Sequence, residues 1–357
     1  MTFPGPWVVR RDSVTLQRRY DGGTTATTLH CCVPGARSAP GRALRCHGAT
    51  LQRWYACHDV ALLRVSFHRS GDLPWQRNGA TVQHRNTAGG MMAVAEIICL
   101  ANFKGGVGKS TTAVNLAAGL AESGHRTLLA DCDPQANASE MFIPEPDIEF
   151  DFRSIIADKV PVEKVVQATR IDRLDVLPAT FDLAYLDKEL VVSPSGVQRI
   201  EKALRDVRDE YDYIVLDTGP NLSHLTLGAL VAARHIVIPV SATVWSTTGL
   251  RKFVRWIDAH REDEVISAQL LGLVATIVPP RTRIGKGLLQ DLANSPFPAF
   301  QTFIPRRIGA EDAALDRAVV GDPGADPVLS DAYRQLTAEV TKRIQDIASD
   351  ERQHRAS

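Results

Sequence analysis

The sequence lacks a surplus of charge of either sign. Its 357 residues contain 41 Lys and Arg against 41 Asp and Glu, a formal net charge of zero. This balance excludes a polycation that coats nucleic acid with its whole surface, and it excludes an acidic tail protein. No apolar run approaches the roughly 20 residues of a membrane-spanning helix. Beyond residue 91 the only cysteines are Cys99 and Cys132. Two isolated thiols exclude a disulfide framework and indicate a reducing compartment such as the cytoplasm.

The first 91 residues lack lysine and glutamate altogether. They contain twelve Arg and four Asp, so this stretch has a net charge of +8 and the remaining residues carry −8. Soluble helical surfaces normally use both missing residue types. Apolar residues here follow no sustained period of 3.6 or 2 residues. We therefore divide the chain into an Arg-, Cys- and His-rich extension, 1–91, and a domain, 92–357.

Three interpretations of the extension are open. Cys46-His47 and Cys57-His58 suggest a zinc module, but zinc ligands usually lie two to four residues apart. An Arg-rich, acid-poor composition suggests a targeting segment, but the apolar run of a signal peptide is missing. The third interpretation, which we favour, is that residues 1–91 are disordered or not natively translated. Its support is Met91-Met92, which directly precedes the first strand-like run.

From residue 92 onward, strand-like apolar runs alternate with helix-like segments. This alternation predicts an α/β domain with a doubly wound, mainly parallel sheet that is covered by helices on both faces. The expected strands are 94–100, 127–130, 174–177, 213–216, 236–240, 270–278 and 300–304. The expected helices are 110–123, 197–210, 222–233, 248–260 and 331–347.

A glycine-rich loop lies between the first expected strand and the first expected helix. Its glycines let backbone N–H groups approach phosphate oxygens, and the following helix adds the partial positive charge of its N-terminus. Lys109 is expected to reach the β- and γ-phosphates, and the Ser110 hydroxyl to ligate Mg²⁺. The predicted nucleotide-binding residues are Lys104, Gly105, Gly106, Val107, Gly108, Lys109, Ser110 and Thr111.

Three motifs together resemble one family. The loop KGGVGKST is similar to the deviant Walker A motif of the ParA/MinD ATPases. Residues 131–137, DCDPQAN, resemble the ParA switch sequence DxDPQxN, and residues 211–220 resemble the Walker B strand of the family. The motifs occur in the family's order, and the resemblance covers essentially all of 92–357. The domain is thereby identified as similar to the ParA partition ATPases, which are P-loop NTPases.

The resemblance implies an activity and a set of site residues. ParA-type proteins form a homodimer on binding ATP and then hydrolyse ATP with Mg²⁺. The implied catalytic residues are Lys104, which reaches the partner's nucleotide, Lys109, and Asp133, which orients the attacking water. The implied metal residues are Ser110, Asp131 and Asp217. For Lys104 the alternative is a solvated surface lysine, and for Asp131 a carboxylate that caps the next turn.

The chain departs from two patterns, one general and one of the family. Phe103 stands where the usual phosphate-loop pattern has glycine. The family usually has two prolines after Asp-Thr of the Walker B strand, whereas this chain has Gly219 and Pro220. We expect Gly219 to loosen the second switch loop.

The resemblance also implies partners. ParA-type dimers bind DNA without sequence specificity, associate with the nucleoid in the cytoplasm, and respond to a ParB-like centromere-binding or cargo-adaptor protein. Arg281, Arg283 and Arg306 are the candidate DNA contacts, with an ordinary solvated surface as the alternative. The surroundings of Arg281 and Arg283 are expected to form a loop. Because 92–357 is acidic overall, the contact must be a local patch with strong salt dependence.

Two other functional classes share the phosphate loop. A MinD-like membrane ATPase needs a terminal amphipathic helix. An apolar stripe that could act as such a helix consists of Leu336, Val340, Ile344 and Ile347. It lacks aromatic anchors, so a helix packed on the sheet is the better interpretation. We therefore expect no membrane partner. An electron-transfer protein needs cysteines for a cluster, and none follows Cys132.

Overall fold

The computed structural model divides the chain into two units, Met1–Asn78 and Gly79–Ser357. Side chains are described for residues 94–190, 195–242, 248–279, 281–307, 318–322 and 324–354. For six strands of the first unit, and for residues 191, 247, 355 and 356, only the backbone is described.

The first unit contains two three-stranded antiparallel sheets. One consists of β1 (Val9–Arg10), β2 (Ser13–Tyr20) and β3 (Gly23–Leu29), and the other of β4 (Arg45–Cys46), β5 (Ala49–Cys57) and β6 (Val60–Phe67). The sequence patterns predicted no regular elements here. The other residues of 1–91, and all side chains including those of the zinc alternative, lie outside the described residues. That this extension is disordered or not natively translated stays a prediction.

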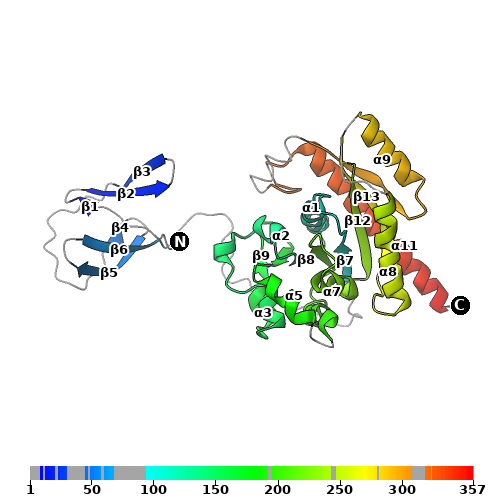
Figure 1. The fold of residues 1–357 in the computed structure, drawn as a ribbon, viewed down its shortest axis with the longest axis horizontal. Coiled ribbons are helices and arrows are strands. Elements are labelled where there is room, and N and C mark those ends of the chain that lie inside the picture. Colours follow the sequence, from blue (N-terminus) through cyan, green and yellow to red (C-terminus); the bar gives the residue numbers. More distant parts are fainter. Residues whose placement is uncertain are drawn as a thin grey trace. The chain divides into compact units, whose positions relative to one another are not determined.

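The second unit is built on an eight-stranded sheet (Figure 1). The strand order is β14-β13-β12-β7-β11-β8-β10-β9, and every pair is parallel except β9 with β10. This confirms the predicted doubly wound, mainly parallel sheet. The strands are β7 (Glu96–Leu100), β8 (Thr127–Cys132), β9 (Gln167–Ala168), β10 (Leu174–Leu177), β11 (Tyr213–Thr218), β12 (His235–Ser241), β13 (Gln269–Val278) and β14 (Ala299–Pro305).

Helices cover both faces of this sheet because its central strands are apolar on both sides. In β7, Ile97 and Cys99 enter one core cluster, while Ile98 and Leu100 enter the other, as the two-residue period of a strand requires. On one face lie α1 (Lys109–Glu122), α2 (Asn137–Glu140) and α11 (Pro327–Ala356). On the other lie α3 (Phe152–Ile156), α5 (Leu183–Val191), α6 (Arg199–Arg205), α7 (His224–Ala232), α8 (Thr247–Glu262) and α9 (Arg283–Ala293). The described residues also include three short turns of helix: η1 (Glu145–Asp147), α4 (Val162–Val165) and η2 (Gly196–Gln198).

The loop predicted around Arg281 and Arg283 is wrong in part, because Arg283 begins α9 rather than lying in a loop. The Thr282 side chain caps this helix by accepting a hydrogen bond from the Gly285 backbone N–H at 3.1 Å. Leu288 and Leu292, one turn apart, are buried against the sheet. Glycines within the segment lower its helix propensity, which is why the sequence pattern concealed it.

The C-terminal helix packs on the sheet. Of its apolar stripe, Leu336, Val340 and Ile344 are at most 3% exposed and belong to the core cluster that contains α1. These side chains are therefore engaged in the core rather than presented to a bilayer, which removes the observation that supported a MinD-like function. Among the described helices, none has both the length and the apolar character needed to cross a membrane.

Candidate nucleotide site

The glycine-rich loop follows β7 and opens α1, as the sequence predicted. Gly106 and Gly108 have φ angles of 69° and 77°, a backbone region that residues with a Cβ rarely adopt. Gly108 is also the N-cap residue, directly before the first residue of α1. The two glycines thus let the loop curl over the positive end of a helix, which is the arrangement that binds phosphate.

Residues from distant strands fix the loop. The Thr276 hydroxyl in β13 donates to the Val107 carbonyl oxygen at 2.7 Å. The Asn102 side chain donates to the Pro239 carbonyl oxygen at 2.8 Å and accepts from the Lys104 backbone N–H at 3.0 Å. Sequence reasoning missed Asn102 and Thr276, because neither belongs to a motif. Their buried hydrogen bonds hold the loop rigidly before any ligand binds.

Lys109 is a buried cation inside the loop. Its side chain is 6% exposed, and its ammonium donates to the Lys104 carbonyl oxygen at 3.1 Å. Burial lowers the pKa of Lys109, while the nearby Asp217 and Asp133 carboxylates oppose that shift. The loop therefore presents a desolvated positive charge beside two carboxylates.

Asp217, at the end of β11, is fully buried. Among the residues that the structure describes, neither of its carboxylate oxygens finds a well-formed hydrogen bond. Burial raises its pKa well above the usual range, the Asp131 charge raises it further, and the approach of the Ser110 hydroxyl lowers it. A buried carboxylate without adequate donors is costly unless it is paired. Asp217 with Ser110 thus has the chemistry to hold a hard divalent cation.

The Asp131 carboxylate differs from that of Asp217 in its hydrogen bonds. One of its oxygens accepts from the Asp133 backbone N–H at 3.0 Å, and the other accepts from the Ser139 backbone N–H and hydroxyl at 2.9 and 2.7 Å. The Ser139 hydroxyl in turn accepts from the Ala179 backbone N–H at 2.8 Å. Burial raises the pKa of Asp131 to about 6 in spite of these bonds. Of the two alternatives for Asp131, the geometry favours the carboxylate that holds the next turn over the metal ligand.

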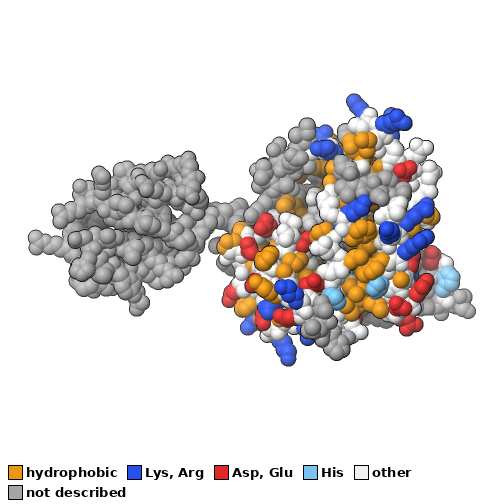
Figure 2. Space-filling view, in the orientation of Figure 1, with side chains coloured by type: hydrophobic (Ala, Val, Ile, Leu, Met, Phe, Trp, Pro, Cys, Tyr) orange, Lys and Arg blue, Asp and Glu red, His pale blue; other side chains and the backbone are white. Residues whose placement is uncertain are grey.

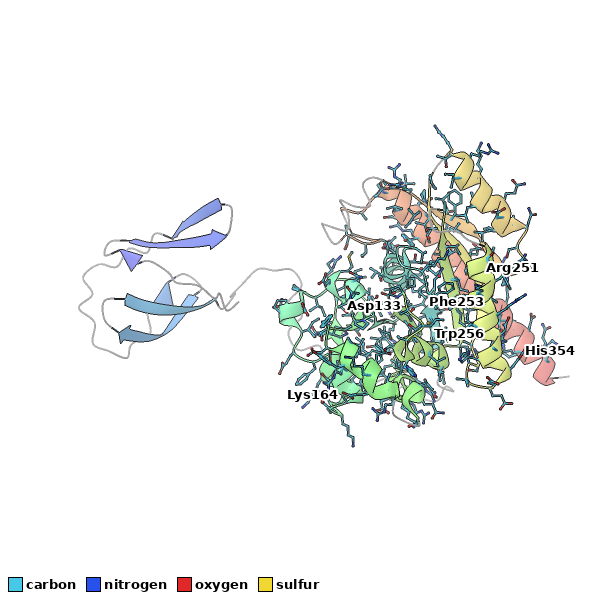
Figure 3. The ribbon with its side chains drawn as sticks, viewed as in Figure 1. Asp133, Lys164, Arg251, Phe253, Trp256 and His354 are labelled. Carbon is cyan, nitrogen blue, oxygen red and sulfur yellow. The ribbon has the colours of Figure 1, made fainter. Side chains whose placement is uncertain are left out.

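Asp133 lies two residues further on (Figure 3) and lines the cavity beside the loop. Its side chain is 5% exposed in spite of that position. One carboxylate oxygen accepts from the Gln135 backbone N–H at 3.0 Å. The turn that follows passes through Ala136 with a φ of 56°. Asp133 is thus a fixed carboxylate close to the place where a terminal phosphate would lie.

The cavity has a volume of about 830 Å³, within the size range of small-molecule sites. It is lined by the glycine-rich loop and Asp133, by the apolar residues Ile304, Pro305, Val320 and Leu329, and by charged residues that include Arg306 and Asp326. A phosphate-binding loop beside a lining of mixed polarity suits a nucleotide, which has both charged phosphates and an aromatic base. No cluster of three or more His, Cys, Asp or Glu able to hold a metal ion exists within the described residues. A cation here would therefore take most of its ligands from phosphate and water.

The three candidate arginines gather at one corner of the sheet. Arg281 and Arg283 follow β13, Arg306 follows β14, and the Arg306 backbone N–H donates to the Val278 carbonyl oxygen at 2.7 Å. All three side chains are exposed. Figure 2 shows basic side chains over α8 and α9 on this face. Arg306 also lines the nucleotide cavity, so its surroundings differ from those of the other two.

Known proteins are similar to this chain over much of its length. Residues 95–270 match the family profile of an AAA domain. The sporulation initiation inhibitor protein Soj of Bacillus subtilis is 37% identical over 225 residues, which are 62% of this chain and 88% of Soj. The chromosome-partitioning ATPase Soj of Thermus thermophilus is 35% identical over 252 residues, 70% of this chain and 96% of that protein. Cobyrinic acid a,c-diamide synthase from Mycobacterium smegmatis, with bound ADP and magnesium, has a TM-score of 0.62 and 25% identity, covering 70% of this chain and 96% of the synthase.

Proposed function

The chain belongs to the Soj/ParA family of partition ATPases, and we propose that it is an ATP-driven switch that positions DNA cargo. The observation that carries this proposal is the buried, under-satisfied Asp217 carboxylate, which lies next to Lys109 and Ser110. Binding of Mg²⁺·ATP supplies both the cation that Asp217 lacks and the phosphates that Lys109 and the loop are built to hold. Relatives with bound ADP and magnesium support this choice of ligand.

Each site residue has a proposed part in hydrolysis. The loop amides and Lys109 bind the phosphates and orient them. Ser110 and Asp217 would hold Mg²⁺, which when bound neutralises phosphate charge. Asp133 orients the attacking water, because phosphoryl transfer needs positioning and charge stabilisation more than a strong base. Asp131 keeps the turn that carries Asp133 in place through its bonds to Ser139.

We expect phosphate release by the full chain with Mg²⁺, ATP and duplex DNA. Asp217→Asn should lower this release by on the order of 10- to 100-fold, because it removes the charge that the cation needs and keeps the shape. The same variant should not lower the melting temperature without ligand, because it neutralises a buried carboxylate that lacks donors. Removal of residues 1–91 should leave the rate unchanged, since we propose that the extension takes no part in the chemistry. Phosphate release by Asp217→Asn at the wild-type rate would contradict the assignment.

We propose that dimerisation, DNA binding and partner-stimulated hydrolysis follow the pattern of the ParA proteins. ATP binding brings two chains together as a homodimer, with Lys104 of each chain acting on the partner's nucleotide. The dimer binds DNA without sequence specificity and so associates with the nucleoid. A ParB-like centromere-binding or cargo-adaptor protein stimulates hydrolysis and returns the chains to the monomer. The residues of the DNA patch are Arg281, Arg283 and Arg306.

The placement of Arg283 supports a DNA patch. It lies in the first turn of α9, which has no acidic residue. A positive side chain at the positive end of a helix is unfavourable for the isolated helix. Arg281, directly before the cap residue, adopts a φ of 60°. An exposed anion such as a DNA phosphate would relieve the repulsion between these charges and the helix terminus.

Arg281→Ala/Arg283→Ala should weaken ATP-dependent DNA binding and flatten its salt dependence. Loss of two phosphate contacts per chain should reduce the slope of log affinity against log salt by about 2 per chain. Fluorescence anisotropy with labelled duplex DNA at several salt concentrations measures this slope. Arg205→Ala, which removes an exposed arginine paired with Glu201 on α6, is the matched control. ATP-dependent DNA binding that does not vary with salt would rule out the patch.

A further inference from the structure

Gly219 directly follows β11, at a position where the family usually has proline. A Cβ atom at this position would lie 3.2 Å from Asp133 Oδ1, 3.4 Å from its Cγ and 3.7 Å from its Oδ2. The three nearest atoms thus all belong to one carboxylate. A separation of 3.2 Å is tighter than ordinary van der Waals contact. With the loop as it stands in this chain, a side chain at position 219 would therefore press on Asp133, and the proline usual in the family needs the carboxylate or the loop in a slightly different place.

Backbone conformation does not explain this glycine. Gly106, Gly108, Gly124 and Gly321 are the described glycines with positive φ, and Gly219 is not among them. An alanine could adopt the backbone of Gly219 without strain. Glycine at position 219 instead leaves space beside the backbone, and the group next to that space is the Asp133 carboxylate.

The Asp133 carboxylate has little room to move elsewhere. Its Oδ1, the atom nearest to position 219, also accepts the hydrogen bond from the Gln135 backbone N–H at 3.0 Å. Its own backbone N–H is bound by Asp131 at 3.0 Å. Lys109 lies close enough for the Asp133 charge to raise its pKa. A side chain at position 219 would therefore move the carboxylate against these contacts, rather than into an empty space.

We propose that Gly219 is a positioning residue for ATP hydrolysis, which sets the place of the Asp133 carboxylate by leaving the space beside it open. This inference rests on the proposed function. A shift of a few tenths of an ångström in the carboxylate misplaces the attacking water relative to the terminal phosphate. Gly219 controls the rate of the chemical step, whereas the glycine-rich loop and Lys109 control nucleotide affinity.

The test is a size series at position 219 in the full chain. Gly219→Ala should lower kcat for ATP hydrolysis by about 3- to 30-fold, given that a misplacement of about 1 Å costs on the order of 100-fold. Gly219→Val should lower it further. The KM for ATP and the melting temperature should stay within about twofold and two degrees of wild type for Gly219→Ala. Gly287→Ala is the matched control, because a Cβ there meets no heavy atom within 4 Å.

A double-substitution experiment separates positioning from general damage. In single-turnover measurements, the residual rate of Asp133→Ala should be the same with and without Gly219→Ala, because no carboxylate remains to be displaced. The inference is wrong if Gly219→Ala keeps the wild-type kcat, or if its loss of rate persists in full in the Asp133→Ala background. It is also wrong if kcat falls only together with nucleotide affinity or melting temperature.

The same measurements distinguish this inference from the proposed function. A wild-type chain that releases no phosphate with Mg²⁺, ATP and DNA would overturn the proposed function, and the inference with it. An active wild type, an inactive Asp133→Ala and a Gly219→Ala at the wild-type rate would overturn the inference alone.

Discussion

Replacing Lys109 by alanine should abolish measurable ATP binding by the full chain. Lys109 is 6% exposed and lies among the loop amides that face the cavity. Truncating one member of a buried charge pair costs about 2–5 kcal/mol, which corresponds to a dissociation constant raised by about 30- to several-thousand-fold. No other residue of the loop supplies a buried positive charge, since Lys104 is only half-buried.

The same substitution should also lower the melting temperature of the protein without ligand. Removing Lys109 leaves the buried Asp217 and Asp133 carboxylates without the nearby cation with which both interact. Adding Asp217→Asn should restore much of the melting temperature but none of the ATP binding, because it relieves the buried charge without replacing the phosphate ligand.

Titration calorimetry with Mg²⁺·ATP and thermal unfolding measure both effects of Lys109→Ala. Lys202→Ala, which removes an exposed lysine of α6, is the control and should change neither quantity. A Lys109→Ala variant that binds ATP within threefold of wild type would contradict this account of the loop.

The part of the site that lies in contiguous sequence could be predicted. The glycine-rich loop, the strand before it and the helix after it form one unbroken segment, so local chemistry defines them. The apolar runs that became β8, β11, β12 and β13 were equally clear, because a strand buried on both faces must be apolar throughout. Asp133 and Asp217 were recognised because they lie in contiguous motifs that resemble the switch sequence and the Walker B strand of the family.

The contacts that decide how each side chain is used could not be predicted. Asp131 and Ser139 are eight residues apart, and Ser139 meets Ala179 across another forty. Thr276 reaches the Val107 carbonyl from 169 residues away. Sequence spacing carries no information on such pairs, which depend on the order of strands in the sheet. For this reason Asp131 read equally well as a metal ligand and as the residue that holds a turn.

Gly219 illustrates the same limit. The sequence revealed a departure from the family pattern and suggested a looser loop. Only the structure identifies the Asp133 carboxylate as the neighbour of position 219. This close approach between two switch segments underlies our proposal, and the looser loop stays a prediction.

Replacing Lys104 by alanine should preserve ATP binding but abolish ATP-dependent dimerisation and hydrolysis. The backbone of Lys104 fixes the loop, since its N–H donates to Asn102 and its carbonyl accepts from the Lys109 ammonium. Alanine keeps both bonds. What it removes is the positively charged side chain of a half-buried residue. In a water-poor dimer interface, a cation beside the partner's triphosphate counts for more than at a free surface.

Light scattering with ATP and Mg²⁺ measures the dimer, and phosphate release measures hydrolysis. We expect Lys104→Ala to stay monomeric, with hydrolysis lowered by on the order of 10³-fold, the scale of a cation supplied in trans to a phosphoryl group. Lys164→Ala, on α4 and well separated from Asp133 (Figure 3), should dimerise and hydrolyse ATP as wild type does. Loss of ATP binding together with dimerisation would mean that Lys104 acts within its own loop. Dimerisation of Lys104→Ala at the wild-type level would refute its action on the partner's nucleotide.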